Sequence, residues 1–154
     1  MTEKVADAAE LRRAAMNWLA RREYSRHEIT QKLEKKFGED VEAEPVLLWL
    51  EDKNFLNDER YVDIFLRMSI ERGHGLLRIR QDLKRRGIDK QLLEEKIESL
   101  EVDWFEKASE TRQRRFGAKP DSQNQKEKAR QLRFLQYRGF TAEQCFNALS
   151  IDPE

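Results

Sequence analysis

The sequence predicts an all-α protein built from three tandem three-helix repeats that form an elongated, curved array. Apolar residues recur at three- and four-residue spacing, which gathers them on one face of a helix, and no stretch shows the alternation of a β-strand. Only 3 Pro and 6 Gly interrupt the 154 residues. The same order of helix, turn and cap also returns along the chain, as is typical of repeat proteins, in which each unit contacts mainly its neighbours.

The first repeat spans residues 11–56 and follows a flexible lead over residues 1–10. Its second helix begins at Ser25, because Ser25 and Glu28 have the spacing of a capping box. Its third helix has Pro45 in the first turn, where the missing amide costs nothing. The apolar residues that we expect in its core are Leu11, Ala14, Ala15, Trp18, Leu19, Ile29, Leu33, Phe37, Val46, Leu47, Trp49 and Leu50.

The second repeat spans residues 57–102, and its central helix is the most clearly bounded of the chain. Gly75 fits the N-cap, and Gly87 fits the left-handed residue just past the C-terminus. The expected caps of the flanking helices are Asn57 or Asp58 and then Asp89. The apolar residues that mark its three helices are Tyr61, Ile64, Phe65, Met68, Leu76, Ile79, Leu83, Leu92, Leu93, Ile97 and Leu100.

The third repeat spans residues 103–150 and follows the same order. Its second helix ends in Tyr-Arg-Gly-Phe at 137–140, which mirrors Arg-Arg-Gly-Ile at 85–88. Thr141 and Gln144 have the spacing of a second capping box, so a last helix begins there. The internal match between these turns is what makes the third unit a copy of the second.

The formal net charge is zero, but the charges are segregated along the chain. Residues 39–63 hold nine acids and two bases, and residues 67–90 hold eight bases and three acids. Residues 91–110 then hold seven acids and two bases, and residues 112–140 hold nine bases and two acids. Such bands indicate either charged partners or solvated helix faces that form their own salt bridges.

Several classes of function find no support in the sequence. The two histidines lie in different repeats, and Cys145, the single cysteine, fits a small core residue better than a nucleophile. The turn from Gly73 to Gly75 lacks the strand and lysine of a phosphate-binding loop. We therefore expect no enzyme, no metal site and no cofactor. No apolar run reaches the length of a membrane span or a signal peptide, so we expect no membrane contact and a cytoplasmic location.

The aromatic residues leave one alternative open. Trp18, Trp49 and Trp104 lie among apolar residues at helical spacing, which favours a core role over stacking on nucleic-acid bases. Tyr137 stands beside Arg138 at a helix end, where stacking on a base or on a partner is a second interpretation.

Several blocks of residues resemble the bacterial RecX family, and the resemblance covers nearly the whole chain. The central block is its most specific part. The residues that carry it are Leu56, Asn57, Asp58, Arg60, Tyr61, Gly73, Gly75, Arg78, Ile79, Arg80, Gln81, Leu83, Gly87, Ile88, Arg133, Phe134, Leu135, Tyr137, Arg138, Gly139 and Phe140. The sequence departs modestly from the family at Asn57, where an acidic residue is common, and at Arg86, where lysine is common.

The resemblance implies three tandem three-helix repeats and a non-enzymatic, negative regulator of the RecA recombinase. Such a protein binds the RecA–DNA filament and suppresses ATP hydrolysis, strand exchange and co-protease activity. We expect a monomer whose partners are the RecA filament and, weakly and without sequence preference, single- or double-stranded DNA. The alternatives are a direct non-specific DNA-binding protein that uses one basic three-helix module, and a general helical scaffold.

The basic second helices of the second and third repeats are the expected contact surface for DNA or for acidic protein surface. The candidate residues there are Arg78, Arg80, Lys84, Arg85, Arg86, Lys126, Lys128, Arg130, Arg133 and Arg138.

Overall fold

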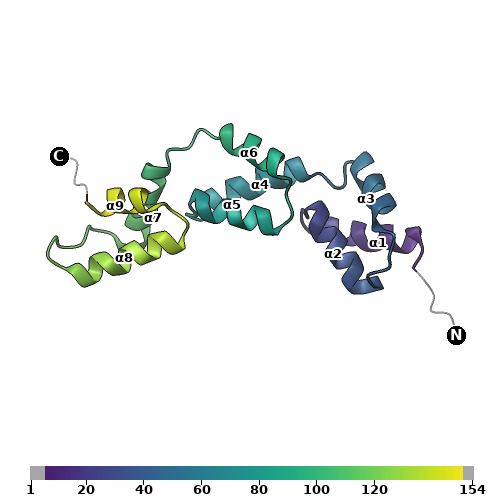
Figure 1. Cartoon of the computed structure of the whole chain (residues 1–154), viewed down its shortest axis with the longest axis horizontal. Coiled ribbons are helices and arrows are strands. Elements are labelled where there is room, and N and C mark those ends of the chain that lie inside the picture. Colours follow the sequence, from purple (N-terminus) through teal and green to yellow (C-terminus); the bar gives the residue numbers. More distant parts are fainter. Residues whose placement is uncertain (1–5, 151–154) are drawn as a thin grey trace. The chain divides into compact units, whose positions relative to one another are not determined.

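The computed structural model describes residues 6–150, and within that range the chain forms nine helices and no strand (Figure 1). The predicted all-α class with three three-helix repeats is confirmed. The helices are α1 Ala8–Leu19, α2 Arg26–Phe37, α3 Ala43–Asp52, α4 Asp58–Glu71, α5 Leu76–Arg85, α6 Lys90–Glu98, α7 Trp104–Phe116, α8 Gln125–Tyr137 and α9 Ala142–Ser150.

The first helix begins earlier than the sequence pattern indicated. Asp7 is the N-cap of α1, and its Oδ1 accepts a hydrogen bond from the Glu10 N–H at 2.9 Å. This cap starts the helix at Ala8, ahead of the first periodic apolar residue, Leu11. Residues 1–5 of the expected lead lie outside the described residues.

Local caps set most of the other helix starts as predicted. Ser25 and Glu28 form a complete capping box at the start of α2, with hydrogen bonds of 2.9 and 3.2 Å. Thr141 and Gln144 form the equivalent pair before α9, at 2.9 and 3.1 Å. Of the two residues considered for α4, Asn57 is the cap, because its Oδ1 accepts from the Arg60 N–H at 2.9 Å.

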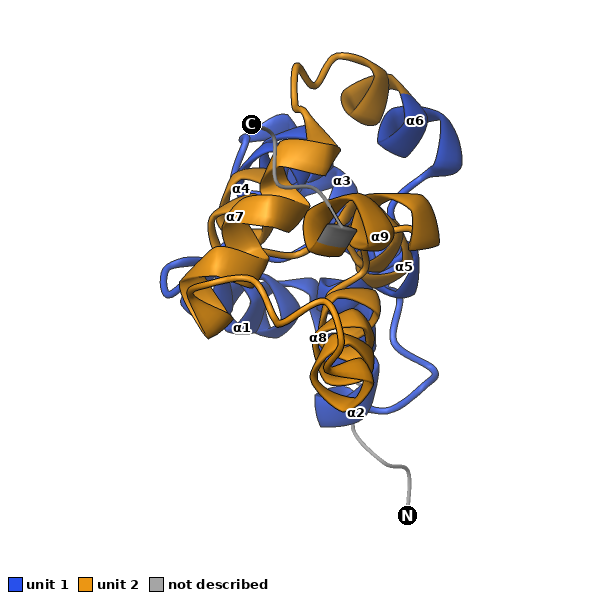
Figure 2. Cartoon of the chain, turned by 90° about the vertical axis from the view of Figure 1, so that its left-hand side faces the viewer, with its two compact units in different colours: residues 1–64, 83–94 blue, residues 65–82, 95–154 orange. Residues whose placement is uncertain are grey.

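The residues group into two compact units that differ from the three sequence repeats (Figure 2). The first unit holds residues 1–64 and 83–94, and the second holds residues 65–82 and 95–154. The middle repeat is thus divided, so that each outer repeat shares a unit with part of it. The repeat boundaries at residues 11–56, 57–102 and 103–150 stay a prediction.

Each unit has its own apolar core. In the first, Leu11, Ile29, Leu33 and Leu47 are at most 2% exposed, and Trp18 and Trp49 pack against the cluster. Leu33 and Leu83, which come from the second helices of the first two repeats, are both fully buried.

In the second unit, Ala108, Leu135, Phe140 and Cys145 form the buried centre, and Trp104 packs against it. The prediction that the three tryptophans serve the core is confirmed by this packing. Cys145 is fully buried, its Sγ lies 3.7 Å from the Phe140 carbonyl oxygen, and burial raises the pKa of the thiol to about 11. A thiol held neutral and out of water is a core residue, as predicted.

The length and polarity of the helices decide whether any of them could span a membrane. Across residues 6–150, every helix is too short or too polar to cross a bilayer.

Candidate functional site

In the first compact unit, the C-terminal turn of α5 contacts the N-terminal turn of α2. The Ser25 hydroxyl donates to the carbonyl oxygen of Arg86 at 2.7 Å, and Ser25 is fully buried. Gly87 adopts a φ of +74°, and a Cβ there would overlap the side chain of His27. Glycine is needed because its backbone is both left-handed and close to α2. We call this contact the α2–α5 junction.

In the second compact unit, the C-terminal turn of α8 contacts the N-terminal turn of α5 in a similar way. The Gly75 N–H donates to the Arg138 carbonyl oxygen at 2.7 Å. The Leu77 N–H donates to the Gly139 carbonyl oxygen at 3.0 Å. Gly139 adopts a φ of +101°, and a Cβ there would lie 2.6 Å from the Arg78 backbone nitrogen. We call this contact the α5–α8 junction.

Both junctions join the carbonyl end of one helix to the amide end of another. This arrangement satisfies backbone groups that a helix terminus leaves unpaired, and it places opposite ends of the helix dipoles together. The mirrored turns at 85–88 and 137–140 showed in the sequence that the two helix ends are alike. The similarity between the two turns did not predict which helix each of them contacts.

Carboxylates offset the arginines around the α2–α5 junction. The Glu28 Oε2 lies 3.8 Å from Arg86 Nε and 3.6 Å from Arg22 Nη2. In the same unit, Arg60 Nε pairs with Glu23 Oε1 at 2.9 Å. The basic side chains of this junction therefore have acidic partners within the protein.

Two groups near the same junction, the Tyr61 hydroxyl and the Asp58 carboxyl, have raised pKa values. Burial, with a smaller contribution from the Glu28 carboxylate, raises the pKa of Tyr61 to about 12. Burial also raises the pKa of Asp58, although its carboxylate accepts a hydrogen bond from the Arg26 N–H at 2.7 Å. Asp58 thus bonds the first turn of α2, which explains why the neighbouring Asn57 caps α4.

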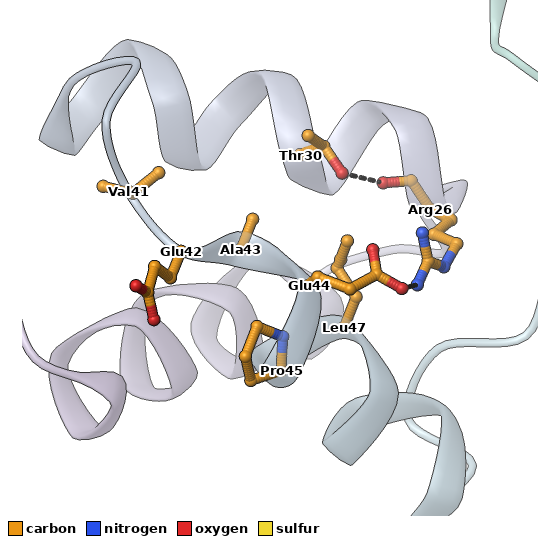
Figure 3. Close-up of a pocket in the computed structure, with 8 residues that line it drawn as sticks. All are labelled: Arg26, Thr30, Val41, Glu42, Ala43, Glu44, Pro45 and Leu47. Carbon is orange, nitrogen blue, oxygen red and sulfur yellow. Dashed lines mark hydrogen bonds and ion pairs between the residues drawn. The ribbon is translucent and has the colours of Figure 1, made fainter.

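Arg26 also closes one side of a pocket of about 560 Å³ in the first unit (Figure 3). Its guanidinium hydrogen-bonds to Glu44, and its Nε lies 3.1 Å from Glu51 Oε1. The hydrogen bond to Glu44 raises the pKa of Arg26 and lowers that of the glutamate. Since Arg26 is already paired with two carboxylates, it is not available to an anionic ligand in this pocket.

The α5–α8 junction differs, because Arg138 and Arg114 beside it, within the described residues, bond carbonyl oxygens instead of carboxylates. The Arg138 Nη1 donates to the Arg72 carbonyl oxygen at 2.8 Å, and the Arg114 Nη1 donates to the Glu71 carbonyl oxygen at 3.5 Å. A pocket of about 170 Å³ lies among them. We call it the arginine pocket, and its lining residues are Arg72, Gly73, Thr111, Arg114, Arg115, Phe134 and Arg138.

The electrostatic field near this junction is positive at His74. Burial, followed by the charges of Arg78, Arg138 and Arg72, lowers the pKa of His74, and the opposing contribution of Asp82 is smaller than that of the arginines together. Burial is the main cause of this lowered pKa, and the nearby arginines add to it.

Comparison with known proteins identifies the family. Models of the first, second and third three-helix domains of RecX match residues 12–47, 57–97 and 101–149. The "Regulatory protein RecX" of Halorhodospira halophila is 41% identical over 154 residues, which cover all of this chain and 95% of the relative. The chain belongs to the RecX family.

Other RecX proteins agree with this assignment. The "Regulatory protein RecX" of Pseudomonas entomophila is 40% identical over 141 residues, 91% of this chain and 90% of the relative. The crystal structure of RecX from Lactobacillus salivarius has a TM-score of 0.71 at 21% identity and covers 92% of this chain and 93% of its own. A second solved regulatory protein RecX has a TM-score of 0.72 at 19% identity and covers 92% of this chain and 72% of its own. The RecX fold is therefore the fold of this chain.

Within this RecX fold, the candidate residues of α5 differ in their surroundings. Arg78 is partly buried at the α5–α8 junction, 3.8 Å from Asp82 and 5.6 Å from the centre of the Tyr137 ring. Arg80 and Arg85 also interact with other residues of the chain. Lys84 is exposed.

The end of α5 holds a candidate with a structural partner. Arg86 lies at the α2–α5 junction beside Glu28, so its charge is offset within the protein. The sequence pattern grouped Arg86 with the basic candidates of the second helix, because the spacing within one helix cannot show an acid that comes from a different repeat.

The candidate residues of α8 also differ in exposure and in whether an acid pairs with them. Lys126 and Arg133 are exposed, and Lys128 is half-buried. Arg130 pairs with Glu127 at 2.8 Å and lies 5.1 Å from the centre of the Phe116 ring. Hydrogen bonds from Gln131 and then Arg130 lower the pKa of Glu127, so this glutamate stays charged beside Arg130.

Arg138 is the candidate with the most specific position. Its guanidinium lies 4.8 Å from the centre of the Phe134 ring and bonds the Arg72 carbonyl oxygen. The structure brings it together with three arginines that the sequence pattern did not single out. The sequence pattern did not select Arg72, because it follows α4 in a different repeat. It did not select Arg114 and Arg115, because they precede the loop to α8.

One member of the second basic band, residues 112–140, is structural. Arg112 is 4% exposed, and its guanidinium donates to the carbonyl oxygens of Gly117 and Ala118 and to Gln131 Oε1 at 3.0, 3.4 and 3.3 Å. Burial lowers its pKa. The band over residues 112–140 is thus not wholly a surface feature.

Proposed function

We propose that this protein is a negative regulator of the RecA recombinase. It binds the RecA–DNA filament and inhibits ATP hydrolysis, strand exchange and co-protease activity. The observation that carries the proposal is the 41% identity to a "Regulatory protein RecX" over all 154 residues. The matches to all three RecX domains support the same function.

The regulation requires binding alone, with no catalytic step and no cofactor. A protein that bridges several RecA subunits opposes their relative movement, provided that it binds one state of the filament better than another. The monomer presents basic helices to DNA phosphates and to acidic filament surface. This use of charge accounts for a sequence that is neutral overall and strongly segregated along its length.

Among the basic candidate residues of the second and third repeats, the proposed contact residues are those whose charge is not offset by a carboxylate of the described chain. Lys126 and Arg133 on α8 are exposed and stand seven residues apart, so they share one face of the helix. Lys84, Lys128 and Arg138 extend the proposed surface. Arg86 and Arg130 contribute less, because Glu28 and Glu127 already neutralise them.

The test is DNA-dependent ATP hydrolysis by RecA at substoichiometric amounts of the purified protein. We expect inhibition by the wild-type protein and weak inhibition by Lys126→Ala/Arg133→Ala. The matched control is Arg13→Ala/Arg21→Ala, which removes two exposed charges from the first repeat and should inhibit as the wild type does. Full ATP hydrolysis in the presence of excess wild-type protein would refute the proposal.

The alternative function is non-specific DNA binding that acts without RecA. The arginine pocket favours it, because four guanidinium groups suit phosphates in any context. The two functions differ in a simple comparison. A DNA-binding protein should inhibit any enzyme that competes for the same DNA, whereas a regulator of RecA should leave an unrelated DNA-dependent ATPase active.

A further inference from the structure

We propose that the arginine pocket binds one backbone phosphate of nucleic acid. The inference deepens the proposed function and rests on it, since it assigns to one place on the chain the DNA contact that filament binding includes. It stands on three features of the described part of the second compact unit: the convergence of arginines from different helices, the lack of carboxylates paired with them, and the fixed orientation of two of the guanidinium groups.

Residues distant in sequence build the pocket. Arg72 and Gly73 come from the turn after α4, Arg114 and Arg115 from the last turn of α7, and Arg138 from the end of α8. The α5–α8 junction holds the α4–α5 turn against the end of α8, because the Gly75 N–H bonds the Arg138 carbonyl oxygen. The pocket is therefore a product of the packing between these elements.

Within residues 6–150, acidic side chains do not offset the positive charge of the pocket. Among the residues that the structure describes, no carboxylate forms an ion pair with Arg72, Arg114, Arg115 or Arg138, and none lines the pocket. At the α2–α5 junction, by contrast, Arg22 and Arg86 both approach Glu28. Like charges that repel within a fold favour the binding of an anion. The lining also excludes a cation as the ligand.

Two of the guanidinium groups contact an aromatic ring that orients them before any ligand binds. The Phe134 ring centre lies 4.8 Å from the guanidinium of Arg138 and 5.8 Å from that of Arg115. Phe116 packs edge-on against Phe134 at 5.2 Å and fixes the ring. Because the ring already restricts these two arginine side chains, they lose less conformational entropy when a ligand binds.

The chemistry of the pocket matches a phosphate group. A guanidinium presents N–H donors in a planar fork that fits two oxygens of a phosphate, and several guanidiniums can share its oxygens. Thr111 adds a hydroxyl at the pocket wall. A phosphodiester is the anion that recurs along nucleic acid, and the sequence tolerance of a backbone contact agrees with the weak, non-specific DNA binding expected of this protein.

The test is binding of the full-length protein to a fluorescein-labelled oligothymidylate, measured by anisotropy over a series of salt concentrations without RecA. Arg114→Gln/Arg115→Gln should weaken binding about tenfold, as expected for loss of charge-assisted hydrogen bonds. The slope of log affinity against log salt should fall by about 0.7 for each phosphate that the variant no longer neutralises. Arg13→Gln/Arg21→Gln is the control with the same change of charge in the first unit, and it should bind as the wild type does.

A second variant separates charge from geometry. Arg138→Lys keeps the charge but loses the planar fork, so affinity should fall while the salt slope stays unchanged. Circular dichroism and melting temperature establish that each variant is folded.

Three results would overturn the proposal. One is an affinity and slope for Arg114→Gln/Arg115→Gln equal to those of the control. Another is undetectable oligothymidylate binding by the wild type at low salt. The third is normal DNA binding by that variant together with lost binding to the RecA filament, which would assign the pocket to a protein carboxylate. Because the assay contains no RecA, its failure leaves the proposed regulation standing, and failed inhibition of RecA leaves the pocket standing.

Discussion

The α2–α5 and α5–α8 junctions have similar backbone geometry and different electrostatics. In each, a left-handed glycine lets the carbonyl end of one helix meet the amide end of another. At the first, Ser25 supplies a side-chain donor and Glu28 neutralises Arg22 and Arg86. At the second, backbone amides supply the donors, and the arginines of the adjacent pocket have no carboxylate partner within the described residues.

The difference separates two uses of arginine that look alike in the sequence. Arg86 and Arg138 both precede the glycine of a mirrored turn, and both were expected at a contact surface. The first is held by Glu28, and the second lies over Phe134 and lines a pocket. Two repeats can therefore share the same packing geometry and still differ in their arginines. In one repeat the arginine is paired with an acid, and in the other it is available for binding.

The largest expected effect is at the glycine of the α5–α8 junction. Gly139→Ala should lower the free energy of unfolding by about 2–5 kcal/mol, because it combines left-handed backbone strain with overlap against the Arg78 backbone. Gly117→Ala is the matched control, since Gly117 has a φ of +75° but a Cβ added there would meet no atom within 4 Å. It should lose only the strain, about 1–2 kcal/mol, in urea denaturation. Equal losses would mean that the junction is not closely packed.

At the other junction, the side-chain donor can be removed. Ser25→Ala should destabilise the protein by about 1–3 kcal/mol, because it removes a helix cap and leaves the Arg86 carbonyl oxygen without its donor. Thermal and urea unfolding measure the loss. Thr141→Ala removes a cap alone and is the control, so a similar loss in both variants would show that the bond to Arg86 adds nothing.

Glu28→Gln removes the carboxylate of the α2–α5 junction, so that its arginines, like those of the arginine pocket, have no acidic partner there. Glutamine still completes the capping box, so the loss of stability should stay within about 1 kcal/mol. Arg22 and Arg86 then lose their acidic partner. The salt slope of oligothymidylate binding should steepen, and an unchanged slope would mean that these arginines face no DNA even when their charge is exposed.

A smaller effect concerns pH and the α5–α8 junction. Burial and the neighbouring Arg78, Arg138 and Arg72 lower the pKa of His74 in the folded state. Below the ordinary histidine pKa of about 6.5, the unfolded chain then binds more protons than the folded one. The free energy of unfolding should therefore fall as pH falls through this range. His74→Gln should reduce that dependence, and identical pH profiles of wild type and variant would contradict the lowered pKa.

Much of the helical order could be predicted because it depends on residues close together in sequence. The Ser25–Glu28 and Thr141–Gln144 boxes span three residues, and each forms as its spacing indicates. The left-handed Gly87 follows in the same way from its place after a helix. Periodicity also placed Leu33 and Leu83 in buried positions, because a helix has a fixed angular repeat.

The partners of the charged side chains depended on the tertiary structure. The Arg86 guanidinium lies beside Glu28 of the first repeat, and the Arg138 guanidinium donates to the Arg72 carbonyl oxygen across 66 residues of sequence. A helical wheel shows which face an arginine occupies, and it contains nothing about the acid, carbonyl or aromatic ring that another helix brings to that face. Arg112 was counted with a basic surface band for the same reason, although the α7–α8 loop helps to bury it. The sequence by itself determined where helices begin, end and turn an apolar side inward, since those are short-range properties of the backbone, whereas the availability of each charge was decided by long-range packing.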